Sequence, residues 1–118
     1  MAYSDIQLQK IRVILAELKV TYEEKKMFNG ICFMVDDKMC FGSHVDKESG
    51  LEIILARMSN ADCQEALEFS SNVPMIMRDK VMPNYIYIGA EEAASDDRMR
   101  YWIGKCLAYN PMAKKSKK

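Results

Sequence analysis

Apolar and polar side chains follow a strand-like pattern between residues 23 and 44, and tight-turn signals interrupt that pattern twice. Asn29-Gly30 separates two apolar runs, and this dipeptide is typical of a type I′ turn, whose two central residues both need a positive φ. Asp36-Asp37 interrupts the next apolar run and predicts a second turn. The region therefore predicts a meander of three antiparallel strands, with Asn29 and Gly30 as structural turn residues.

Two-residue turns would fix the register of this meander. They place Met27 opposite Cys32 in the first hairpin and Phe33 opposite Cys40 in the second. Because successive side chains of a strand point to opposite faces, each face then carries its own set of residues. One face holds an apolar set that we treat as a candidate interaction face: Met27, Cys32, Met34, Met39 and Phe41.

The opposite face of the predicted meander is also apolar at its centre, with Phe28, Ile31, Phe33, Val35 and Cys40. An antiparallel sheet with one solvated face should instead alternate apolar and polar residues. We therefore expect the second face to be covered by helices, by a partner subunit or by a ligand.

Beyond the meander, the spacing of apolar residues predicts three helices and further strands. A capping box at Ser4–Gln7 precedes a helix over 5–18, and Ser59 can cap a short helix ending near Phe69. A third helix is expected from about residue 91 until Pro111 ends it. The first strand is expected over 21–28, and the later strands over 51–56, 75–77 and 85–88. The order α-β-β-β-β-α-β-β-α indicates the α+β class, with helices on an antiparallel sheet.

A chain of 118 residues is long enough for one self-sufficient core. We expect residues 1–110 to form a single domain and residues 111–118 to form a basic, disordered tail. No apolar run approaches the roughly 20 residues of a membrane span, and the N-terminus lacks the pattern of a secretory signal. Four cysteines without a C-x-x-C pair indicate buried thiols in a reducing cytoplasm.

The formal net charge is zero, but its distribution is uneven. The final KKSKK holds four of the 17 basic residues, which leaves 17 − 4 = 13 basic against 17 acidic residues in the body. A body with an acidic excess does not suit a phosphate backbone, so we do not expect direct nucleic-acid binding.

Candidate chemistry is sparse. His44 is the one histidine, and with Asp46 nearby it could serve acid–base chemistry, but no partnered nucleophile and no glycine-rich phosphate loop accompany it. Cys/His spacing typical of zinc is also missing. We predict no catalytic, cofactor-binding or metal-ligating residues. The ten methionines suit either plain core filling or an adaptable binding surface.

Several motifs together resemble the N-terminal domain of the TfoX/Sxy competence regulators. They are the Lys25–Gly30 turn, the Cys32–Met34 strand, Pro74-Met75, and the aromatic strand Tyr85–Ile88. The final helix with Trp102 and Leu107 fits as well. We expect a single-domain member that lacks the regulators' C-terminal domain, and Asn29 replaces their first turn glycine.

This resemblance implies a non-enzymatic, cytoplasmic domain with a two-layer fold like that of type III secretion chaperones, which pair as dimers. We expect a homodimeric interaction module that acts through protein–protein contacts, with a partner in transcription control or competence. The alternative is a small-ligand sensor, or an undetected enzyme, that uses the sheet face near His44.

Overall fold

The computed structural model describes residues 5–27, 30–46 and 49–113, and their elements broadly follow the predicted order. The fold is α+β, as the sequence predicts. The described residues form α1 (Asp5–Glu17), β1 (Glu23–Met27), β2 (Gly30–Val35), β3 (Lys38–Val45), β4 (Glu52–Arg57), α2 (Asn60–Ala66), β5 (Val73–Met77), β6 (Lys80–Ile88), α3 (Ala90–Ala93), α4 (Asp96–Tyr109) and a 3₁₀ turn (Asn110–Met112).

The six strands form one sheet in the order β1-β2-β3-β4-β6-β5, and every neighbouring pair is antiparallel. The chain leaves β4 through α2, forms β5 at the far end of the sheet, and returns through β6 beside β4. The two ends of the sheet are therefore β1 and β5.

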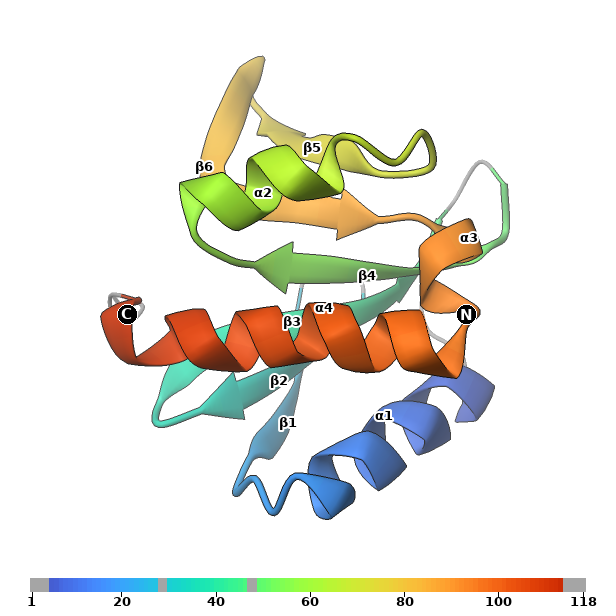
Figure 1. Ribbon diagram of the computed structural model, residues 1–118, viewed down its shortest axis with the longest axis vertical. Coiled ribbons are helices and arrows are strands. Elements are labelled where there is room, and N and C mark those ends of the chain that lie inside the picture. The colour runs from blue at the N-terminus through green and yellow to red at the C-terminus, as the bar shows by residue number, and fades with distance from the viewer. Residues whose placement is uncertain (1–4, 28–29, 47–48, 114–118) are drawn as a thin grey trace.

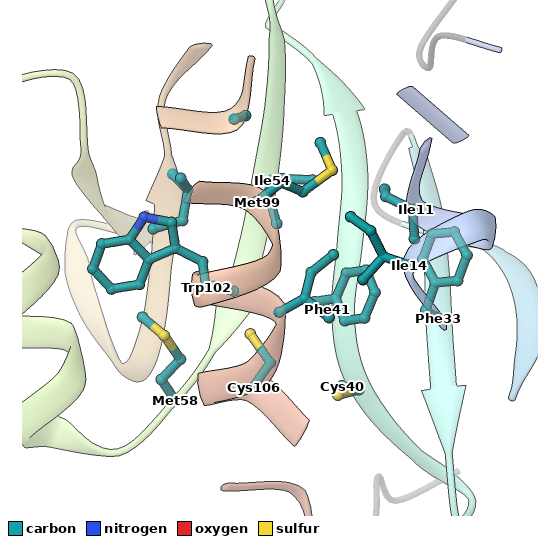
Figure 2. Close-up of a cluster of buried hydrophobic side chains, with 14 of the residues drawn as sticks. Ile11, Ile14, Phe33, Cys40, Phe41, Ile54, Met58, Met99, Trp102 and Cys106 are labelled. Atoms are coloured by element: carbon teal, nitrogen blue, oxygen red, sulfur yellow. The ribbon is translucent and has the colours of Figure 1, made fainter. Parts of the chain in front are cut away.

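The four α-helices cover one face of the sheet, as Figure 1 shows, with α4 across the middle strands, α1 towards β1 and α2 towards β6. Their apolar sides meet the inward side chains of β2, β3, β4 and β6 in the main core. Figure 2 shows that core: in this view Phe41 and Ile14 lie between the side chains of α4 and Phe33, and Ile11 lies beside Phe33.

Local capping explains where the helices begin. The Ser59 hydroxyl accepts a hydrogen bond from Asp62 N and starts α2, as predicted. The predicted last helix divides into α3 and α4, because Ser95 interrupts it and its hydroxyl accepts from Arg98 N to start α4. The proposed cap at Ser4 lies outside the described residues.

Trp102 of α4 contacts both α3 and the residues that follow α2. Its ring is buried against Phe69 and Tyr101, and its Nε1 donates to Glu92 Oε1 of α3 at 2.8 Å. The same Glu92 oxygen accepts from Arg98 Nε at 2.8 Å, and the Arg98 guanidinium lies 4.6–5.4 Å from the centres of the three rings. The indole therefore fixes α3 and the residues after α2 onto α4.

The register of the second hairpin was predicted correctly only near its turn. Met34 lies opposite Met39, but Phe33 lies opposite Phe41 rather than Cys40. A β-bulge at Cys40 inserts one extra residue into β3, and a one-residue shift moves the following side chains to the other face. The Phe41 ring consequently stacks on Phe33, with ring centroids 4.9 Å apart, on the helix-covered face. Its assignment to the candidate interaction face was wrong.

The pairing register of the first hairpin also differs from the prediction. Met27 pairs with Gly30, and Lys25 rather than Met27 lies opposite Cys32. The shift of two residues keeps the side chains of Lys25 and Lys26 on their predicted faces, whereas the Met27 side chain, assigned to the candidate interaction face, lies outside the described part of the chain. Asn29 lies outside the described residues, and Gly30 is the first residue of β2 instead of a turn centre.

Gly30 has a packing role that differs from the predicted one. A Cβ at this position would overlap the carbonyl oxygen of Ser43 and lie 2.6 Å from His44 Nδ1. A side chain is excluded by the close approach of β3, so the glycine is needed for space and not for a positive φ. The second turn matches its prediction, because Asp36 and Asp37 both adopt positive φ, at 56° and 62°.

Residues 111–113, which were predicted to belong to a disordered tail, are ordered in a 3₁₀ turn and the residue that follows it. Lys38 is buried at the start of β3, and its Nζ donates to the carbonyl oxygens of Asn110 and Pro111 at 3.1 and 3.3 Å. These contacts hold the 3₁₀ turn against the sheet, and Ala113 is buried behind it. Residues 114–118 lie outside the described part of the chain.

Candidate protein-interaction surface

The face of the sheet opposite the helices carries a second, smaller apolar cluster. It consists of Cys32, Met34, Met39, Leu55 and Met75, with Met82, Tyr85 and Tyr87 packed at its border. Within the described part of the chain, every member comes from a strand. We call this set the strand-only cluster.

The strand-only cluster is buried within a single copy of the chain. Cys32 and Leu55 are 0 % exposed, and Met34 and Met39 are 8 % and 3 % exposed. Side chains of β5 and β6 pack over the cluster, which makes a helix, a partner or a ligand unnecessary for covering it. The expectation that one of those three must cover this face was therefore wrong, and Cys32, Met34 and Met39 do not form an open surface.

The border of this cluster is polar and aromatic. The Arg57 guanidinium lies 5.4 Å from the centre of the Tyr85 ring, and its Nη1 donates to the Met39 carbonyl at 3.3 Å. Burial, followed by the nearby charge of Asp46, raises the pKa of the Tyr87 phenol. These contacts describe a packed edge of the sheet.

His44 lies beside the strand-only cluster and is only 5 % exposed. Its imidazole occupies space left by two glycines, since a Cβ on Gly42 would lie 3.0 Å from His44 Nε2 and one on Gly30 would be closer still. The ring also meets Tyr87 edge-on, with centroids 6.3 Å apart. Asp46 Oδ2 accepts from Ser49 N and Oγ at 3.1 and 2.7 Å, within the turn that follows β3. The environment of His44 is that of a packed side chain, which a substrate cannot approach directly.

Exposed apolar side chains gather instead on the hairpin that joins β5 to β6. Val73, Ile76, Met77 and Val81 are 41–62 % exposed. Ile76 and Val81 lie directly opposite each other, next to a turn at Arg78-Asp79 in which both residues have positive φ. The hairpin projects beyond the helices at the top of Figure 1. We call residues 73–81 the edge hairpin.

The edge hairpin combines two features of protein-binding surfaces. Its outer strand, β5, ends the sheet, so its outward backbone groups can pair with an added strand. Its exposed aliphatic pair would be removed from water by such a partner. The sequence contained a signal for this site, the two apolar runs on either side of Arg78-Asp79, but it did not show which side chains the helices leave exposed.

A groove of about 300 Å³ lies in the helix layer between α1 and α4. Its lining includes Lys10, Val13, Asp96 and Arg100. The charges are paired across it, since Lys10 Nζ lies 3.6 Å from Asp96 Oδ1 and Arg100 Nη2 lies 3.1 Å from Glu17 Oε1. A groove whose charges are already compensated offers no specific recognition of a charged ligand.

The four cysteines are all buried and free, and none is activated. Burial raises the thiol pKa of Cys32 and Cys63 to about 11 and that of Cys40 to about 12, and it raises the pKa of Cys106 well above its ordinary value. A nucleophilic cysteine needs the opposite shift. Among residues 5–27, 30–46 and 49–113, no group of three His, Cys, Asp or Glu side chains is placed to hold a metal ion.

The thiol pKa values predict a loss of stability in alkali. The unfolded chain releases thiol protons from about pH 9, whereas the folded chain retains them to about pH 11 or 12. The stabilisation is complete below pH 9, and the free energy of unfolding should fall above it by up to about 1.4 kcal/mol per pH unit for each thiol. Urea unfolding measured on both sides of pH 9 tests this.

Cys40→Ala provides the control for the alkaline experiment. Removing one buried thiol should make the decline above pH 9 shallower, because one proton fewer distinguishes the two states. A free energy of unfolding that stays constant between pH 9 and 11 would contradict the prediction.

None of the helices in the described ranges has the length and apolar character needed to cross a membrane. Comparisons of the chain with protein-family models, with curated proteins and with solved structures find no match.

Proposed function

We propose that the protein is a non-enzymatic interaction module that binds a protein partner through the edge hairpin. The observation that carries this proposal is the exposed pair formed by Ile76 of β5 and Val81 of β6, at the β5 end of the sheet. The partner is a protein that offers an apolar surface or an extended segment, because the hairpin presents aliphatic side chains beside an open strand edge.

The chemistry of the described residues supports a binding role over a catalytic one. Elevated thiol pKa values favour unreactive cysteines, and the packed position of His44 leaves no room for a substrate beside it. We propose that the chain works in the cytoplasm, where free thiols persist. The resemblance to the TfoX N-terminal domain adds that the partner acts in transcription control or competence.

Photo-crosslinking from the hairpin tests this proposal. A photoreactive residue at Ile76 in the intact chain should crosslink to a discrete protein in the native cytoplasm. With the photoreactive residue at Met77, Ile76→Ser with Val81→Ser should lower the crosslinking yield at least tenfold relative to the same probe in the otherwise unchanged chain, because the contact loses its apolar area. The fold should survive, since both side chains are already largely exposed.

The matched control changes two other exposed aliphatic residues, Ile6→Ser with Val13→Ser on α1, while the photoreactive residue stays at Met77. This variant should retain the full crosslinking yield. If the two serine variants reduce the yield equally, or if no discrete product forms from position 76, the edge hairpin is not the binding surface.

A further inference from the structure

The other end of the sheet has a charge pattern of its own. β1 lies at that end and contains the run Glu23-Glu24-Lys25-Lys26, in which all four residues are exposed although only 26 % of the Glu24 side chain is. Edge strands that only avoid pairing place charge there so that an incoming strand is repelled. Two acidic residues followed by two basic residues do not repel every incoming strand. A second copy of the same strand, running antiparallel, would place its basic residues across from the acidic residues of the first.

Symmetry limits which residues could meet if β1 paired with itself. Two antiparallel copies of a strand are related by a twofold axis perpendicular to the sheet, so residues opposite each other must point to the same face. Lys25 lies opposite Cys32 and therefore points to the strand-only face together with Glu23. Glu24 and Lys26 lie opposite Phe33 and Ile31 and point to the helix face.

Two registers centred on this run satisfy the symmetry requirement, and each places opposite charges across from each other. An axis at Glu24 sets Glu23 opposite Lys25 of the second copy, and the reverse, on the strand-only face. An axis at Lys25 sets Glu24 opposite Lys26 of the second copy, twice, on the helix face. Opposite charges directly across an antiparallel pair stabilise it.

Arg12 favours the first of these registers. Its Nε and Nη2 donate to the two carboxylate oxygens of Glu24, each at 2.8 Å. The two Glu24 carboxylates that would meet at the axis are thus each neutralised by a guanidinium from α1. At an axis on Lys25 the two ammonium groups would meet without such compensation, because within the described ranges no carboxylate forms an ion pair with Lys25.

From this charge complementarity we propose that a second copy of the chain docks on β1, with Glu24 at the twofold axis, and joins the two sheets into one of twelve strands. A second copy is the partner that fits best, because β1 carries both the acidic pair and the basic pair that an antiparallel copy would match. The inference is independent of the edge hairpin, because β1 and β5 lie at opposite ends of the sheet.

Charge-block variants of the full chain test the dimer. Light scattering after size-exclusion chromatography at micromolar concentration should give twice the 13.6 kDa monomer mass for the wild type. Glu23→Lys with Glu24→Lys, and separately Lys25→Glu with Lys26→Glu, should each give the monomer mass, because every register then opposes like charges. An equimolar mixture of the two variants should restore the doubled mass, since all opposed residues become complementary.

The control reverses charges at the other end of the sheet, through Arg78→Glu with Lys80→Glu, and should leave the dimer intact. Circular dichroism confirms that each variant is folded, and slowed amide exchange of β1 with rising wild-type concentration gives a second readout that needs no variant. A wild-type chain that stays at the monomer mass, a block variant that stays dimeric, or a mixture that stays monomeric overturns the proposal. A monomer that still crosslinks through Ile76 would separate this failure from a failure of the proposed function.

Discussion

Gly89→Ala is expected to lower the free energy of unfolding by about 3 kcal/mol, a large part of the stability of a domain of this size. Gly89 is buried between β6 and α3, and a Cβ there would overlap the carbonyl oxygen of Ser71 and lie 2.7 Å from its carbonyl carbon. The obstacle is backbone, which cannot rotate away. The loop is also held in place, because Asn72 Oδ1 accepts from Gly89 N at 2.8 Å while Asn72 Nδ2 donates to Ala66 O at 2.9 Å.

Gly104→Ala is the matched control, and the change should have the opposite sign. Gly104 lies inside α4, and a Cβ there would meet nothing within 4 Å. Alanine should therefore stabilise the protein by about 0.5–1 kcal/mol, because it costs less backbone entropy in a helix than glycine. Urea denaturation followed by circular dichroism measures both values. Equal effects of the two substitutions would show that the close approach at Ser71 has no energetic weight.

Trp102→Ala should cost about 4 kcal/mol, through the lost burial of the indole and the cavity that it leaves. The side chain is 1 % exposed and contacts Phe69 and Tyr101 edge-on. Its loss also removes the hydrogen bond to Glu92, whose remaining partner at that oxygen is Arg98. Because this indole joins α3 and α4, we expect the amides of α3 to exchange faster in the variant. Unfolding by urea and hydrogen exchange measure the two effects.

Trp102→Phe separates packing from the hydrogen bond. Phenylalanine retains most of the ring contacts, so its cost should be near 1–2 kcal/mol and well below that of alanine. A phenylalanine variant as unstable as the alanine variant would contradict the packing explanation and assign the effect to Glu92.

Local patterns predicted the elements of this fold well. Ser59 starts α2 as its capping position indicated, and Asp36-Asp37 forms the tight turn that its place between two apolar runs suggested. The α+β class followed from the order of these elements. Such features are determined by neighbours a few residues apart, which is the information that a single sequence contains.

The same local patterns did not predict the long-range geometry of the sheet. The bulge at Cys40 depends on how β2, β3 and α4 pack together, and no residue type marks it, so Phe41 was placed on the wrong face. The insertion of β6 between β4 and β5 was equally invisible. Because β5 and β6 cover the strand-only cluster, the candidate site moved from the central strands to the edge hairpin. The methionines at the centre of the sheet, Met34 and Met39, are core residues.

The strand order has a geometric consequence for any assembly of this fold. β1 and β5 terminate the sheet on opposite sides, so whatever occupies one terminus leaves the other accessible. Two copies joined at β1 would present their aliphatic hairpins at the two distant extremities of one continuous ribbon of strands. A target that contains two suitably spaced copies of the recognised segment could then bind both hairpins at once. Its overall affinity would rise through avidity, although neither single contact becomes tighter.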